Sequence, residues 1–159
     1  MPTSPTIEKQ LAQAQRLCDN RGQRLTPVRA RVLEILLSSD QPLGAYELLE
    51  QYKKRHPSGA QPMTIYRALH FLHSQGLVHH LNSRRQYVAC DHSHTSGAFI
   101  QLLLCDQCGQ TQELPLAPDL SKALQQGVTQ QSFRLQQTEL ELHGLCAHCQ
   151  PPEKDPAHV

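Results

Sequence analysis

The sequence predicts an α+β fold of two small domains, a winged helix-turn-helix followed by an α/β domain that holds a metal ion. Residues 1–89 contain twelve Lys and Arg against six Asp and Glu, whereas residues 90–159 contain three against eight. The basic part shows four helical patterns and a hairpin, and the acidic part contains two Cys-x-x-Cys pairs. A basic module joined to an acidic one suggests a polyanion-binding domain attached to a second unit. With 4% aromatic residues and no Trp, either unit would gain stability from metal or dimerisation.

Three helices are expected in the first 55 residues: over 6–20, from Thr26-Pro27 onward, and near 44–55. Each has apolar residues at helical spacing. Thr caps free amides and Pro fits a first turn, which places the start of the second helix. Cys18 falls on the apolar face of the first helix, so we interpret it as a buried small residue rather than a reactive thiol.

The fourth helix is expected over residues 63–75, with Gly76 as its C-terminal cap. Its apolar face consists of Ile65, Ala68, Leu69 and Leu72. A hairpin pattern follows over residues 77–89, with a polar turn at 82–85. Helices followed by a basic-tipped hairpin predict a helix-turn-helix with one wing.

The polar face of the fourth helix suggests contact with DNA. Arg67 could reach guanine edges or phosphate, and Thr64 and Tyr66 could reach phosphate or a thymine methyl group. Basic residues at a wing tip contact backbone phosphates, which adds affinity for DNA but no sequence specificity. The residues expected at phosphates are Arg84 and Arg85 in the wing, with Arg24, Arg29 and Tyr46 elsewhere. For each of these residues the alternative is an ordinary solvated surface position. For Arg67 we favour contact with DNA, because the polar residues of its helix all point the same way.

The two Cys-x-x-Cys pairs are Cys105 with Cys108 and Cys146 with Cys149. Two such pairs can complete a tetrahedral thiolate site for zinc. The segment between them has room for a strand, a helix over about 117–127 and a returning strand over about 133–143. A redox role is the alternative, but two pairs favour zinc. Four thiolates leave no open coordination position, so this zinc would be structural.

A second set of possible ligands lies between the two domains. It consists of His79, Cys90, His92, His94 and Glu113. Thiolate, imidazole and carboxylate together suit zinc better than magnesium or calcium, which prefer oxygen. Each residue taken alone could be ordinary surface, because histidine is frequent in this chain.

The sequence shows no sign of membrane insertion or secretion. Residues 1–5 lack the pattern of a signal peptide, and the longest apolar stretches are too short to span a bilayer. We therefore expect a soluble, cytoplasmic protein without a membrane partner. A zinc enzyme or dithiol oxidoreductase is the competing class. Because no His-Glu-x-x-His motif, Gly-rich phosphate loop or nucleophile elbow is present, we expect no catalytic residue and no small-molecule substrate.

Several segments taken together resemble the ferric uptake regulator family, and its zinc uptake regulator branch in particular. The matching segments are RLTPVR at 24–29, TIYRAL at 64–69, GLVH at 76–79, YVAC at 87–90, CDQCG at 105–109 and HGLCAHC at 143–149. The resemblance implies an α+β fold with a C-terminal α/β dimerisation domain and structural zinc. It also implies a homodimer that binds double-stranded operator DNA and represses zinc uptake genes when zinc-loaded.

By the same resemblance, Cys105, Cys108, Cys146 and Cys149 would hold the structural zinc. The regulatory zinc would be held by His79, Cys90, His94 and Glu113, which gives about two zinc ions per protomer. The helix carrying Tyr66 and Arg67 would read the operator, assisted by Tyr46. The presence of Cys90 separates this ligand set from those of the iron and manganese branches, whose sites resemble sets of nitrogen and oxygen ligands only.

The chain departs from the family pattern at His94, which follows Cys90 by only four residues where close relatives have a longer loop. His94 is the preferred ligand, and His92 is the alternative. We expect a DNA-binding domain over residues 1–89, a hinge near 82–94, a metal-binding dimerisation domain over 95–150 and a flexible tail over 151–159. A zinc ion across this hinge would fix the separation of two winged helices. A sensor of another metal or of peroxide is the alternative within the family.

Overall fold

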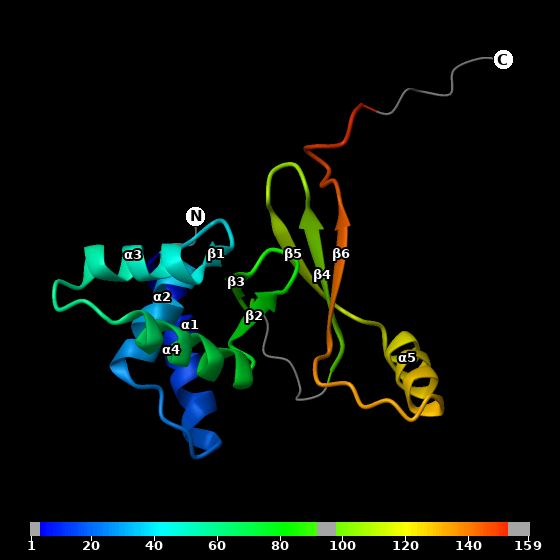
Figure 1. The fold of residues 1–159 in the computed structure, drawn as a ribbon, viewed down its shortest axis with the longest axis horizontal. Helices are drawn as coiled ribbons and strands as arrows, with labels where there is room; N and C mark the ends of the chain where they lie inside the picture. Colours follow the sequence, from blue (N-terminus) through cyan, green and yellow to red (C-terminus); the bar gives the residue numbers. More distant parts are fainter. Residues whose placement is uncertain (1–3, 92–97, 153–159) are drawn as a thin grey trace.

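The computed structural model describes residues 4–91 and 98–152, and it confirms the α+β class (Figure 1). Its first part contains α1 (Ser4–Asn20), α2 (Pro27–Leu37), β1 (Leu43–Gly44), α3 (Ala45–Arg55), α4 (Pro62–Ser74), β2 (Val78–Leu81) and β3 (Gln86–Ala89). Its second part contains β4 (Ile100–Cys105), β5 (Thr111–Pro115), α5 (Pro118–Gln130) and β6 (Glu139–Gly144). The four N-terminal helices therefore begin within two residues of the predicted positions, and α1, α3 and α4 also end within two residues of them.

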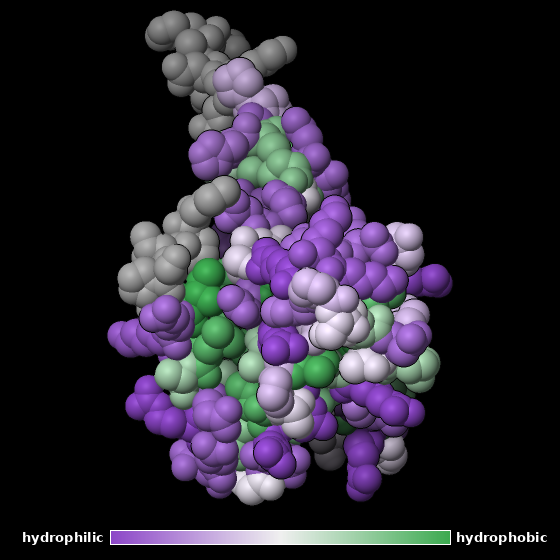
Figure 2. All heavy atoms as spheres, turned by 90° about the vertical axis from the view of Figure 1, so that its left-hand side faces the viewer, coloured by the Kyte–Doolittle hydropathy of each residue, from purple (hydrophilic) through white to green (hydrophobic). Residues whose placement is uncertain are grey.

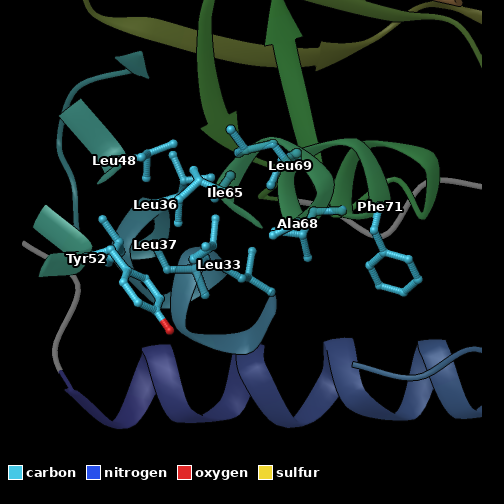
Figure 3. Packing of buried hydrophobic residues seen from close by; sticks show 14 of the residues in the cluster. Leu33, Leu36, Leu37, Leu48, Tyr52, Ile65, Ala68, Leu69 and Phe71 are labelled. Atoms are coloured by element: carbon cyan, nitrogen blue, oxygen red, sulfur yellow. The ribbon is translucent and has the colours of Figure 1, made fainter. Parts of the chain in front are cut away.

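The main core lies between α1, α2, α3 and α4. Apolar side chains from three of these helices meet there in Figure 3, including Leu33, Leu36, Leu48, Tyr52, Ile65 and Leu69. Cys18 of α1 is fully buried in the same core, which confirms its structural interpretation. Burial of this apolar surface fixes α4 by its inner face, so its polar face is left on the outside.

Gly76 ends α4 as the sequence predicts. Its φ of 71° lies in the left-handed region, which a glycine adopts without the steric cost that a side chain would bring. The backbone amide of Leu77 donates to the carbonyl of Leu72, and the amide of Gly76 donates to the carbonyl of His73. This pair of bonds is the Schellman motif, and it turns the chain directly from α4 into β2.

Two three-stranded sheets follow, with the orders β1-β3-β2 and β5-β4-β6. In the second sheet β4 is central, antiparallel to β5 and parallel to β6. Ile100, Leu102 and Leu104 alternate along β4 and are buried. They form a small second core with Leu81 and Val88 of the hairpin. The hairpin therefore packs on one face of the C-terminal sheet.

The region between the two Cys-x-x-Cys pairs differs in part from the prediction. The helix α5 runs to Gln130, past the expected end near 127. The returning strand starts at Glu139 rather than near 133, because its partner β4 starts at Ile100, which pairs with Glu139. Every residue of α5 is described and none is buried, and the helix stands apart from the sheet in Figure 1.

The face of the molecule seen in Figure 2 is mainly hydrophilic, with apolar side chains visible between the polar ones. More exposed large apolar side chains belong to the C-terminal half, among them Leu120, Phe133, Leu142 and Leu145. Within the described part of the chain, none of the helices combines the length and the apolar character needed to cross a bilayer.

Candidate metal centres and nucleic-acid interface

The four cysteines of the two Cys-x-x-Cys pairs meet at one end of the C-terminal sheet. Cys105 ends β4, and parallel pairing sets it beside Gly144 at the end of β6, just before Cys146. The four sulfur atoms all lie within 4.8 Å of one another, and the sulfurs of Cys108 and Cys146 are 3.7 Å apart. Four thiolates about 2.3 Å from one zinc ion lie about 3.8 Å apart in a tetrahedron. The arrangement therefore fits zinc.

The electrostatics of this cysteine cluster also suit a cation. Backbone hydrogen bonds from Cys108 and Cys146 lower the pKa of Cys105 to about 6, so its thiolate is favoured. The pKa of Cys149 is raised to about 12 by its hydrogen bond with Cys146 and by the neighbouring thiols. Four thiolates so close together repel one another, and a divalent cation is what allows all four to be ionised.

Three of the predicted regulatory ligands come together in a second cluster. His79 belongs to β2, Cys90 follows β3, and Glu113 belongs to β5. His79 Nε2 lies 3.1 Å from Glu113 Oε2, and Cys90 Sγ lies 3.6 Å from Glu113 Oε1. Ligands of one tetrahedral zinc ion lie about 3.3–3.6 Å apart. The donor set therefore fits zinc, whereas His92 and His94 lie outside the described residues.

The second cluster is enclosed between the hairpin and the C-terminal sheet. The side chains of His79 and Glu113 are only 3% and 5% exposed. Burial alone would lower the pKa of His79, but hydrogen bonds to Cys90, Glu113 and Glu139 outweigh it and raise the pKa to about 11. The protein thus concentrates acidic groups around one imidazole. A metal ion can replace the imidazole proton, because histidine coordinates metal in its neutral form.

Glu139 and His73 lie beside the second cluster and were not identified as site residues from the sequence. Glu139 Oε1 lies 3.1 Å from His79 Nδ1 and 3.2 Å from His73 Nε2. Burial raises the pKa of Glu139, but hydrogen bonds with His73 and His79 outweigh burial and lower it to about 2. The only sequence signal was the alternation of Glu139 and Glu141 in a strand, which shows a shared face but not its partners.

The hairpin turn contacts the C-terminal sheet through Arg84. Its guanidinium donates to the carbonyl of Cys105 at 2.9 Å and pairs with Asp106 at 3.1 Å. The sequence prediction placed Arg84 on DNA phosphate, whereas the structure places its charge against the Cys105–Cys108 turn. The neighbouring Arg85 is exposed. The turn is held on its other side by Glu141, whose carboxylate accepts hydrogen bonds from the backbone amides of residues 82 and 83.

The predicted recognition residues lie on the outer face of α4 and near it. Tyr66 is 52% exposed and Arg67 is exposed, whereas Thr64 is partly buried. A surface hollow is lined by Arg29, Tyr66, Arg67, His70, His73 and His80, among others.

The residues predicted to contact phosphates lie outside α4. Tyr46 is 73% exposed at the start of α3, and Arg24 is exposed before α2. The Arg29 guanidinium stacks 3.5 Å from the centre of the Phe71 ring. Contact of these residues with DNA stays a prediction.

Comparison with known proteins identifies the family. Residues 20–143 match the Ferric uptake regulator family. The chain is 38% identical over 148 residues to the zinc uptake regulation protein of Escherichia coli (strain K12), an alignment covering 91% of this chain and 83% of that protein.

Solved structures agree with this match. A zinc uptake regulator complexed with zinc and DNA superposes with a TM-score of 0.82 at 35% identity, covering 93% of this chain and 96% of that one. Holo XcZur gives a TM-score of 0.77 at 39% identity, covering 87% and 95%. Apo XcZur gives only 0.52 at 37% identity, covering 90% and 97%. On the sequence match over most of its length, this chain belongs to the ferric uptake regulator family.

Proposed function

We propose that this chain is a zinc-responsive transcriptional repressor, which binds operator DNA as a homodimer when zinc-loaded and controls zinc uptake genes. The observation that carries the proposal is the position of the His79–Cys90–Glu113 cluster, in which the side chains of His79 and Glu113 are buried and Cys90 is half-buried. Its members come from the hairpin, from the segment that leaves the hairpin, and from the C-terminal sheet. A metal ion bound there ties the DNA-binding domain to the rest of the protein.

The two clusters have different roles in this proposal. The Cys105–Cys108–Cys146–Cys149 cluster holds a structural zinc that joins the ends of β4 and β6. The His79–Cys90–Glu113 cluster holds the regulatory zinc, with His94 as the fourth ligand and His92 as the alternative. About two zinc ions per protomer follow from this assignment. The thiolate of Cys90 favours zinc over manganese or magnesium, which prefer oxygen ligands.

Zinc acts in this proposal by fixing the relative position of the two domains. The domains are taken as residues 1–89 and 95–150, with a hinge near 82–94. The present arrangement is more similar to holo XcZur than to apo XcZur, which supports the view that it is the metal-loaded arrangement. If zinc favours the DNA-competent arrangement, DNA must tighten zinc binding by the same factor. A coupling of about 1–3 kcal/mol changes affinity about 5- to 150-fold.

The outer face of α4 is the proposed reading surface. Arg67, Tyr66 and Thr64 would enter the major groove, since α4 is fixed by its buried face, exposes Arg67 and Tyr66 and leaves Thr64 partly accessible beside them. Tyr46, Arg24 and Arg85 would contact phosphates. The similarity to a zinc uptake regulator complexed with zinc and DNA supports this placement.

A second copy of the chain is the proposed partner of the open face of the C-terminal sheet. The hairpin covers the face that carries Leu102, so the alternate residues point the other way. Leu114 and Leu142 on that other face are 38% and 47% exposed. Apolar side chains left in water at a sheet face favour association. Replacing Leu142 by Glu should therefore give a monomer in light scattering, and a dimer of unchanged stability would contradict this assignment.

We propose that the protein has no catalytic activity and acts in the cytoplasm. Membership of a family of regulators supports both points. The buried second cluster also suits sensing better than hydrolysis, because a hydrolytic zinc needs an open position for water and a nearby base.

The proposal is tested by restoring DNA binding to metal-free protein with one metal at a time. Zinc should restore binding at about two ions per protomer, whereas iron or manganese should not. His79→Ala should abolish the zinc-dependent part of binding and leave a folded dimer, because the Cys105–Cys108–Cys146–Cys149 cluster is unchanged. Restoration by iron or manganese, or loss of binding on peroxide treatment, would favour a different sensor. Normal zinc-dependent binding by His79→Ala would remove the assignment of the site.

A further inference from the structure

Glu139 lies where the second cluster, the C-terminal sheet and α4 meet. It is the first residue of β6, and its side chain is only 13% exposed. Its Oε1 atom lies within hydrogen-bond distance of two imidazoles, His79 of β2 and His73 in the last turn of α4. One carboxylate oxygen of the C-terminal sheet thus contacts both a predicted zinc ligand and the predicted recognition helix.

The two nitrogens of His79 face different partners. Nε2 lies 3.1 Å from Glu113, on the side of the metal cluster, and Nδ1 lies 3.1 Å from Glu139. A carboxylate that accepts a hydrogen bond from Nδ1 keeps the imidazole hydrogen on that nitrogen. The lone pair of Nε2 can then bind a metal ion. Glu139 therefore holds the ring in the orientation and tautomer that coordination requires.

The contact with His73 extends this effect to the reading surface. His73 lies six residues after Arg67 on the same rigid helix, and the chain passes from α4 through the Gly76 turn directly into β2. Since both rings meet the same oxygen atom, a shift of His79 or Glu139 also displaces the partner of His73. The line of contacts from Glu113 through His79 and Glu139 to His73 is continuous.

From this geometry we infer that Glu139 is a positioning residue that couples occupancy of the zinc site to the orientation of α4. It presents His79 to the metal, and through His73 it fixes α4 against β6. This inference rests on the proposed function, because it specifies how zinc at that site reaches the DNA-binding surface.

Glu141 provides a matched control on the same strand. It lies two residues from Glu139 on the same face of β6, but it accepts hydrogen bonds from the backbone of residues 82 and 83 in the hairpin turn. Glu141→Gln therefore removes one carboxylate charge from the same face and leaves the contacts to His79 and His73 in place.

The test measures two quantities in the full-length protein. The first is zinc affinity, from competition with a chromophoric chelator, and the second is the ratio of DNA affinities with and without zinc. Glu139→Leu should lower zinc affinity at the second site about 10- to 100-fold. Glu139→Gln keeps an accepting oxygen and should recover part of this loss. His73→Ala should leave zinc affinity within about twofold but reduce the DNA-affinity ratio about fivefold. Glu141→Gln should change neither quantity.

A merely structural role would lower the melting temperature of the Glu139 and His73 variants together and would not separate zinc affinity from coupling. The inference is overturned if Glu139→Leu binds zinc like the wild type, or if His73→Ala keeps the full DNA-affinity ratio. Failure of the proposed function would look different, because the wild type itself would then show no zinc-dependent ratio. The zinc titration would still test whether Glu139 positions His79.

Discussion

Replacing Arg84 by Gln should lower the free energy of unfolding and leave the affinity for DNA unchanged. The neighbouring Arg85 in the same hairpin turn should show the opposite pattern. The Arg84 side chain is only 21% exposed, and its guanidinium is bound to the turn that carries Cys105 and Cys108. Arg85 is exposed. The two arginines therefore separate a structural effect from an electrostatic one within the same turn.

The expected magnitude follows from one hydrogen bond. The bond from Arg84 to the Cys105 carbonyl is 2.9 Å long, and a bond with a charged partner contributes about 1.5–3 kcal/mol. The bond to the Gly109 carbonyl is long at 3.4 Å, and Asp106 is 53% exposed, so both should add little. We expect Arg84→Gln to lower the free energy of unfolding by about 1.5–3 kcal/mol, or Tm by roughly 3–10 °C for a chain of this size.

Thermal melts of the zinc-loaded protein and DNA titrations at several salt concentrations distinguish the two residues. Arg84→Gln should melt early and bind DNA normally well below its Tm. Arg85→Gln should melt like the wild type, bind DNA more weakly and reduce the salt slope by about one unit, as expected for a lost phosphate contact. An Arg84→Gln protein with wild-type Tm and weakened DNA binding would refute this reasoning and return Arg84 to the phosphate backbone.

Three further predictions follow from the fold and the two surfaces. Leu102→Ala, in the fully buried centre of the small second core, should lower the free energy of unfolding by about 2–5 kcal/mol, measured in denaturant melts. A loss below about 1 kcal/mol would show that this core contributes little to stability. Arg67→Ala should weaken operator binding about 5- to 150-fold and relax specificity at one base pair, and unchanged affinity would remove α4 from the major groove. Burial raises the pKa of Glu141, but hydrogen bonds from Ser83 and Asn82 outweigh burial and lower it, so this carboxylate stabilises the fold above its unfolded pKa and the contribution disappears as pH falls. Melts over about pH 5 to 3 should therefore show wild type losing its advantage over Glu141→Gln, and a constant difference would contradict the shift.

The N-terminal helices could be predicted well because local signals agree there. Apolar spacing, Pro27 at a helix start and Gly76 at a helix end all act within a few residues, and the structure satisfies each of them. The two-residue strand β1 was not predicted, because two residues carry no periodic pattern. The start of β6 was placed too early because strand length is set by the partner strand, and that pairing is a long-range property.

The predictable part of the metal clusters was the identity of their donors. Side-chain chemistry selected the cysteine pairs and a second set of five candidates, and the family resemblance reduced this set to His79, Cys90, His94 and Glu113. The structure brings three of these four together. The contacts of Arg84 and Glu139 could not be found in the same way. They depend on the packing of the hairpin against the C-terminal sheet, which brings together segments 21 or more residues apart in the chain. Charge alone favoured an exposed, DNA-facing Arg84.

The parallel alignment of β6 with β4 makes one six-residue strand a spacer between the two metal clusters. Glu139 lies at one end of this strand, and the turn with Cys146 begins just beyond the other. Extra residues in the exposed 131–136 segment would leave both ends in place. A single residue inserted within β6 would reverse the facing of the strand residues on one side of the insertion, so that either Glu139 turns away from the hairpin or Leu142 turns toward it. The first change would disturb His79, and the second would shift the cysteine turn.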